Sequence, residues 1–267
     1  MIPSPKQPCQ NAVRFLDAQG SVAAQASACE GGLLALPDRH RWVVEVANLT
    51  TDASASFSLV IRPAPSVREQ SLRIGDTATG SLDVPGQRDD YLIDLARGDV
   101  IYLARVGDVS CDVSLQVLPD RGVPVAKGGA CLDVGRVDIA TSGRYRIRVA
   151  APVLFSGRYG FQVLRSRADH RSSVHVGSAA AGSIDAPGAR DVYRVDAPAG
   201  SKLRLRGEQA GGCHLWFRLY DGRGNTQGGL IPLCSDSVIT VTADGMEIRV
   251  LGIERTTGDY TFRLDPT

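Results

Sequence analysis

Six cysteines are the side chains best suited to covalent chemistry in this sequence of 267 residues. They form three pairs of similar spacing: Cys9 and Cys29, Cys111 and Cys131, Cys213 and Cys234. A turn sequence with glycine lies near the middle of each pair, for example Asp-Gly-Arg-Gly at 221–224. If strands flank the turn, the two cysteines face each other at the open end of a hairpin, within reach of a disulfide. We expect three local disulfides, with buried free thiols as the alternative; no CxxC motif or histidine cluster favours a metal.

A second group of candidate residues follows Cys213 in the sequence CHLWFRLY. Strand alternation turns its leucines and Phe217 inward. The opposite face then carries His214, Trp216, Arg218 and Tyr220. Because sugars stack on flat rings and exposed aromatic patches mark interaction sites, this face is a candidate binding site for a glycan or a protein. The alternative is that Trp216 packs under a loop or against a neighbouring repeat.

Arginines alternate along two other predicted strands. Arg144, Arg146 and Arg148 form one outward stripe, and Arg204 and Arg206 form another. Such stripes suit acidic sugars or peptides, but they also suit a solvated strand face that resists edge pairing, which is the interpretation we favour.

Catalytic motifs are missing from the sequence. None of the four histidines lies in HExxH, and there is no G-x-S-x-G elbow or phosphate-binding loop followed by a lysine. We therefore predict no catalytic residues and no enzyme activity.

Close acidic groupings are the only sign of a metal site. Asp89-Asp90 and Asp108 with Asp112 are such groupings, but neither recurs fully in the rest of the chain. We interpret Asp89 and its counterpart Asp191 as hydrogen-bonding residues at strand starts. No cofactor is expected, and calcium is a weakly supported alternative.

An internal repeat organises all these residues. Residues 74–111 and 176–213 align without a gap at an offset of 102. Gly80, Asp89 and Tyr91 match Gly182, Asp191 and Tyr193. The same offset carries the cysteine pair of the middle copy back to the N-terminal pair, so residues 1–62 look like the C-terminal half of a further copy.

Short alternating apolar runs separated by glycine and aspartate turns predict an all-β protein of tandem jelly-roll or Greek-key sandwiches. Val113, Leu115 and Val117 are expected to face inward, as are Tyr145 and its neighbours at alternate positions. The predicted division is a half repeat at 1–62, a linker at 63–70, a sandwich at 71–164, a linker at 165–173 and a sandwich at 174–267.

The pattern resembles the bacterial pre-peptidase C-terminal domain. The residues that carry it in the middle copy are Gly80, Asp89-Asp90-Tyr91, Gly98, Asp120, Gly143-Arg-Tyr145 and Gly157-Arg-Tyr159. In the last copy they are Gly182, Asp191, Tyr193, Gly200, Asp221 and Gly258-Asp-Tyr260, while Met246-Glu247 replaces the first G-x-Y tyrosine. The resemblance implies a jelly-roll-like sandwich that is not catalytic and that serves substrate binding, localisation or stability of a secreted or surface protein.

Composition narrows the partners. The net charge of +1 argues against a nucleic-acid partner, and no apolar run is long enough to span a membrane. Only three lysines among 30 basic residues hint at a GC-rich bacterial source. Local disulfides indicate an oxidising, extracytoplasmic compartment, either secreted or at the cell surface. We expect an accessory module for substrate anchoring or adhesion, joined to an upstream domain; a purely structural stalk is the alternative.

Overall fold

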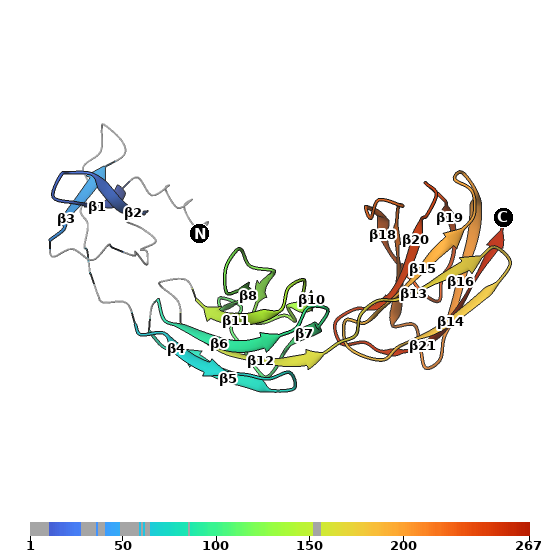
Figure 1. The fold of residues 1–267 in the computed structure, drawn as a ribbon, viewed down its shortest axis with the longest axis horizontal. Helices are drawn as coiled ribbons and strands as arrows, with labels where there is room; N and C mark the ends of the chain where they lie inside the picture. The colour runs from blue at the N-terminus through green and yellow to red at the C-terminus, as the bar shows by residue number, and fades with distance from the viewer. Residues whose placement is uncertain are drawn as a thin grey trace, which may run out of the picture.

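The structure is a computed structural model that describes residues 11–27, 36, 41–48, 59, 61, 65–84, 86–151 and 156–267. The described residues form 21 strands and no helix, as the sequence predicts. Two β-sandwiches lie end to end along the long axis of the molecule, and a smaller three-stranded sheet precedes them (Figure 1).

The middle sandwich consists of two sheets. One has the order β4 (Arg68–Ser71), β6 (Arg88–Leu95), β11 (Gly143–Ala150), β8 (Ser114–Pro119) and β9 (Ala126–Gly129). The other has the order β10 (Gly135–Asp138), β7 (Val100–Arg105), β12 (Gly157–Arg165) and β5 (Thr77–Leu82). Their facing side chains enclose one apolar core, in which Phe161, Ile147 and Leu115 are buried. The alternation along β11 is confirmed, since Tyr145, Ile147 and Val149 are all buried.

The last sandwich repeats this arrangement strand by strand. Its five-stranded sheet has the order β13 (His170–His175), β15 (Arg190–Asp196), β20 (Glu247–Gly252), β17 (Leu215–Tyr220) and β18 (Thr226–Pro232). Its four-stranded sheet has the order β14 (Ala179–Ile184), β21 (Gly258–Pro266), β16 (Lys202–Gln209) and β19 (Asp236–Thr240). Because each strand has a counterpart in the middle sandwich, residues at matching register can be compared directly.

The N-terminal sheet has the order β2 (Val22–Ser27), β1 (Asn11–Leu16) and β3 (Val43–Asn48). This order and its antiparallel pairing match β9, β8 and β11 of the middle sandwich. The three strands therefore correspond to the C-terminal half of the repeat.

The segments predicted as linkers contain strands. β4 lies within and just beyond 63–70, and β13 begins within 165–173; each adds a parallel edge strand to the five-stranded sheet of its sandwich. All four residues of β4 are exposed. An edge strand of this kind needs no apolar alternation, so its sequence resembles that of a linker.

Two of the expected disulfides are present. Cys111 is bonded to Cys131 across a Cα–Cα distance of 4.7 Å, and Cys213 is bonded to Cys234 across 5.7 Å. Each joins the start of a β-hairpin to its end. The third predicted pair, Cys9 and Cys29, lies outside the described residues.

A buried tyrosine pair ties the two sheets of each sandwich together. In the middle copy the hydroxyls of Tyr91 and Tyr159 lie 2.7 Å apart, and that of Tyr159 also donates to the buried carboxylate of Asp89. Arg68, on the edge strand β4, completes the network with an ion pair of 3.1 Å to Asp89. The last copy has the same network in Tyr193, Tyr260, Asp191 and Arg167. The aspartates thus accept hydrogen bonds at strand starts.

Candidate functional site

One arginine of the middle copy makes several of the contacts at the junction between the two sandwiches. Arg136, on β10, donates from Nη1 to the carbonyl oxygens of Arg167, at 2.9 Å, and Gly188, at 2.8 Å. Its Nη2 lies 2.6 Å from Asp138 and 3.0 Å from Asp169. With only 10% of its side chain exposed, Arg136 connects β10, the inter-repeat segment and a turn of the last copy.

An aromatic contact adds to this junction. A Cβ added at Gly188 would lie 2.7 Å from Cδ2 of Tyr102, and Gly188 has a φ of 72°, which favours glycine. The hydroxyl of Tyr102 donates to Asp133 at 2.8 Å, and Asp133 also pairs with Arg255 of the last copy at 3.2 Å. Burial and the neighbouring carboxylate raise the pKa of Tyr102, so this hydroxyl remains a hydrogen-bond donor.

A cleft of about 480 Å³ opens beside these contacts. The middle copy contributes Tyr102, Leu132, Asp133, Gly135 and Arg136 to its lining. The last copy contributes Gly188, Ala189, Arg190, Arg218, Tyr220, Leu251, Gly252 and Glu254. The cleft therefore exists only because the two sandwiches meet, and both supply its walls.

The four residues predicted as a binding patch are divided by the structure. Arg218 and Tyr220 line the cleft. Trp216 lies on the same strand and is half-buried, paired in register with Leu251, while His214 is exposed before the strand begins. The cleft thus receives two of the four side chains, and neither Trp216 nor His214 is among its lining residues.

Tyr220 is held by its neighbours on β20. The guanidinium carbon of Arg249 lies 3.7 Å from the centroid of the Tyr220 ring, in a cation–π contact. Glu247 neutralises Arg249 at 2.8 Å and Arg171 at 2.9 Å. Burial acts to raise the pKa of Glu247, but the hydrogen bonds and charges of Arg249 and Arg171 outweigh it, so the pKa lies below its ordinary value.

Arg218 differs from the other cationic residues at this site. Its Nε is buried and has no hydrogen-bond partner, and no carboxylate among the described residues forms an ion pair with it. Glu254, also in the lining, is exposed and has no hydrogen bond or ion pair within the described part of the chain. The cleft therefore holds one uncompensated cation and one uncompensated anion.

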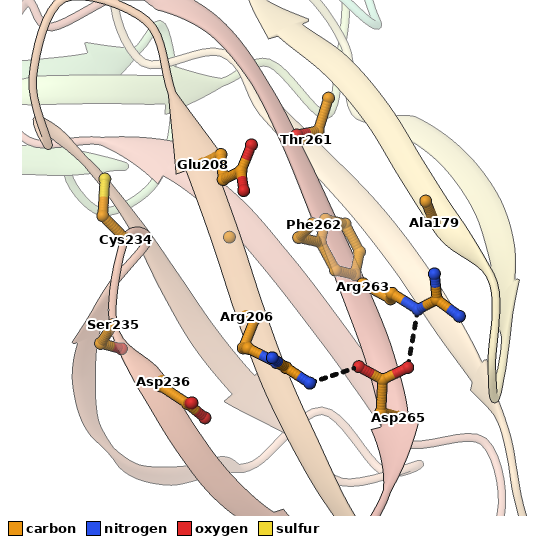
Figure 2. A pocket seen from close by; sticks show the side chains of 11 residues that line it. Ala179, Arg206, Glu208, Cys234, Ser235, Asp236, Thr261, Phe262, Arg263 and Asp265 are labelled. Atoms are coloured by element: carbon orange, nitrogen blue, oxygen red, sulfur yellow. Dashed lines mark hydrogen bonds and ion pairs between the residues drawn. The ribbon is translucent and has the colours of Figure 1, made fainter.

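A second hollow, of about 620 Å³, lies on the outer face of the four-stranded sheet of the last copy. Figure 2 shows Arg206 and Arg263 directed toward the shared carboxylate of Asp265, at 3.0 and 2.7 Å. Arg204, in the same stripe, pairs with Asp236 at 3.4 Å. The predicted arginine stripe on β16 is thus neutralised within its own sheet.

The arginine stripe of the middle copy is neutralised in a similar way. Arg146 and Arg148 lie 3.2 and 2.9 Å from the buried carboxylate of Asp90. Arg144 pairs with Asp94 at 3.2 Å. Among the described residues no group of three or more His, Cys, Asp or Glu side chains is arranged to hold a metal ion.

Sequence reasoning missed the middle-copy half of the site. Tyr102 and Arg136 belong to no motif of the sequence, whereas Gly188 belongs to a Pro-Gly turn sequence that is repeated at 85–86 and 187–188. That repeated turn was the available signal, but its contact partner, Arg136, lies 52 residues earlier in the chain. No helix in the described part of the chain is long and apolar enough to cross a membrane.

No family model and no curated protein matches this chain. Among solved structures, it is similar to PliG, a periplasmic inhibitor of g-type lysozyme from Aeromonas hydrophila, with 12% identity, 38% of this chain and 100% of that chain covered, and a TM-score of 0.32. It is similar to the pre-peptidase C-terminal domain of collagenase from Bacillus anthracis, with 13% identity, coverage of 37% and 98%, and a TM-score of 0.30. The CUB1-EGF-CUB2 domain of human MASP-1/3 gives 10% identity, coverage of 70% and 99%, and a TM-score of 0.24. These similarities do not assign the chain to a family.

Proposed function

We propose that this chain is a non-catalytic, extracytoplasmic accessory module of a bacterial secreted or surface protein, and that it anchors its parent protein to a glycan or protein ligand. The local disulfides support an oxidising compartment. The repeat motifs support a relationship to the pre-peptidase C-terminal domain. In this proposal the chain forms and breaks no covalent bond in its ligand. It acts by holding the ligand near an attached domain.

The cleft between the sandwiches is the observation that carries the proposal. Clefts between domains are common ligand sites, and about 300–1,000 Å³ is a usual size for a small-ligand pocket. This one measures about 480 Å³ and contains an aromatic ring together with unpaired charged groups. A ligand that brings polar groups to these charges would satisfy them.

Retention on immobilised ligands tests the proposal. The oxidised full chain is passed over insoluble pectin, cellulose, chitin and collagen, and the bound fraction is measured. We expect retention on at least one matrix, and we expect Tyr220→Ala, at a residue that lines the cleft, to reduce it. Arg206→Gln, on the opposite sheet of the same sandwich, is the control and should leave retention unchanged. Equal retention of all variants, or no retention at all, would contradict the proposal.

A structural spacer is the second candidate, and the closed junction favours it. Arg136 makes three polar contacts across the junction, to Arg167, Asp169 and Gly188, which fix the angle between the sandwiches. A stalk that sets a distance between other domains would use this rigidity and need no ligand. The same retention experiment separates the two functions, since a spacer predicts no bound matrix and no effect of Tyr220→Ala.

A further inference from the structure

We propose that the cleft between the two sandwiches binds a uronic acid residue of an acidic polysaccharide, with the sugar carboxylate paired to Arg218. This inference rests on the proposed function and adds the chemical class of the ligand. It starts from the one arginine of the cleft that has no counter-charge.

Two arginines line the cleft besides Arg218, and both are compensated. Arg136 and Arg190 share Asp169, at 3.0 and 2.9 Å, and Arg255 pairs with Asp133 at 3.2 Å. Arg218 alone among the arginines lining the cleft lacks a carboxylate, although its Nε is removed from solvent. A buried guanidinium nitrogen without a partner costs free energy, and an incoming carboxylate would recover it.

The middle sandwich has a neutral residue at the matching position. Arg218 pairs in register with Arg249, and the corresponding pair in the middle copy is Gln116 with Arg148. In the last copy an arginine therefore replaces a neutral amide.

The neighbouring carboxylate has changed as well. Asp90 pairs in register with Arg148 and neutralises it at 2.9 Å, whereas Val192 occupies that register beside Arg249. Glu247 compensates Arg249 from a different position, which leaves nothing for Arg218. The last copy has thus gained a cation, Arg218, without gaining a carboxylate that pairs with it.

The remaining lining suits a sugar. Gly135 contributes no side chain to the wall, and a Cβ added there would meet nothing within 4 Å, so a ring can approach the backbone at that point. The free carboxylate of Glu254 can accept hydrogen bonds from sugar hydroxyls. Tyr220 offers a ring edge and a hydroxyl with no partner in the described residues. A ligand that carries one carboxylate among several hydroxyls satisfies both Arg218 and Glu254.

Charge favours this ligand over an acidic peptide. A segment with several carboxylates would meet the uncompensated charge of Glu254 and the carboxylate of Asp133 in the same cleft. A hexuronate brings a single negative group to Arg218 and hydrogen-bond donors to Glu254.

Calorimetric titration of the oxidised full chain tests the inference. The probes are oligogalacturonate, oligoguluronate and hyaluronan oligosaccharides, with maltotetraose as the neutral control and oligoglutamate as the peptide control. We expect at least one uronate oligomer to bind, and neither control to do so. Arg218→Gln, which installs the middle-copy residue, should weaken binding by about tenfold or more, the usual loss for a charge-assisted hydrogen bond. Arg218→Lys should retain part of the affinity.

One further variant and a stability measurement guard against a folding artefact. Arg206→Gln should have no effect, because that residue lies on the other sheet. Melting temperatures of all variants are compared with that of the parent.

The outcomes distinguish the inference from the proposed function. Failure of every uronate probe, equal binding by Arg218→Gln, or tighter binding of oligoglutamate would each overturn the uronate site. If matrix retention that depends on Tyr220 survives one of these results, the accessory function stands with a different ligand. Loss of both retention and uronate binding removes the two together.

Discussion

The hydroxyl of Tyr159 occupies the space that a side chain at position 80 would need. A Cβ added at Gly80 would overlap the Tyr159 hydroxyl and lie 2.6 Å from Cζ of the same ring. Gly182 and Tyr260 have the same relationship in the last copy, where Cζ lies 2.7 Å from the added atom. The glycine on β5 or β14 therefore leaves room for the tyrosine on the last strand of the same sandwich, which explains why the two recur together.

Gly80→Ala should destabilise the middle sandwich by about 1–3 kcal/mol, the usual cost of overpacking a filled site. The tyrosine cannot retreat without losing its hydrogen bonds to Asp89 and Tyr91. During chemical denaturation, the unfolding transition of the last sandwich, followed by the fluorescence of Trp216, should be the same as in the parent chain. Near-ultraviolet circular dichroism should show the loss of stability of the middle sandwich. Gly182→Ala is the matched variant and should reverse which sandwich is affected.

Removal of the disulfide in the middle copy should also be local. Cys111→Ser combined with Cys131→Ser opens a loop of 20 residues and should lower the free energy of unfolding by about 2–4 kcal/mol. Differential scanning calorimetry measures the loss.

Non-reducing peptide mapping of the parent chain should find the two observed bridges and the predicted Cys9–Cys29 bridge. A bridge between repeats would contradict the repeat model.

Arg136→Ala should release the two sandwiches from each other. The substitution leaves the carbonyl of Gly188 without its donor and removes a cation from Asp138 and Asp169. We expect small-angle scattering to report a wider distribution of maximum dimensions, with little change in the stability of either sandwich. Arg158→Ala, at an exposed ion pair away from the junction, is the control. An unchanged scattering profile would show that Tyr102 and Arg255 hold the junction without Arg136.

The same junction should weaken in acid. Burial acts to raise the pKa of Asp138, but the hydrogen bonds from Arg136 and the charges of Arg136 and Arg190 outweigh burial. The pKa of Asp138 therefore lies below its ordinary value of 3.8. A depressed pKa in the folded state means that the stabilisation is present above the ordinary pKa and is lost as the pH falls through the lowered value. Scattering curves recorded near neutral pH and well below pH 3.8 should therefore differ. Asp138→Asn should remove part of that pH dependence; identical titrations of parent and variant would refute this assignment.

Features that repeat along the chain were predictable from the sequence. The offset between copies identified the cysteine pairs, and local alternation identified Ile147 and Val149 as core residues, because neighbours on a strand take opposite faces whatever lies beyond them. The edge strands β4 and β13 were not predicted, because exposed residues such as those of β4 leave no apolar pattern in the sequence.

The candidate site depended on tertiary structure. The sequence by itself determined that Arg218 faces away from the core, but only the packing of the two sandwiches brought it into a cleft with residues of the middle copy. Whether an arginine is compensated depends on which carboxylates lie within a few ångströms, and the partners of Arg136 come from positions up to 52 residues away. Contacts of this kind have no sequence period, because they depend on how two separately folded units meet.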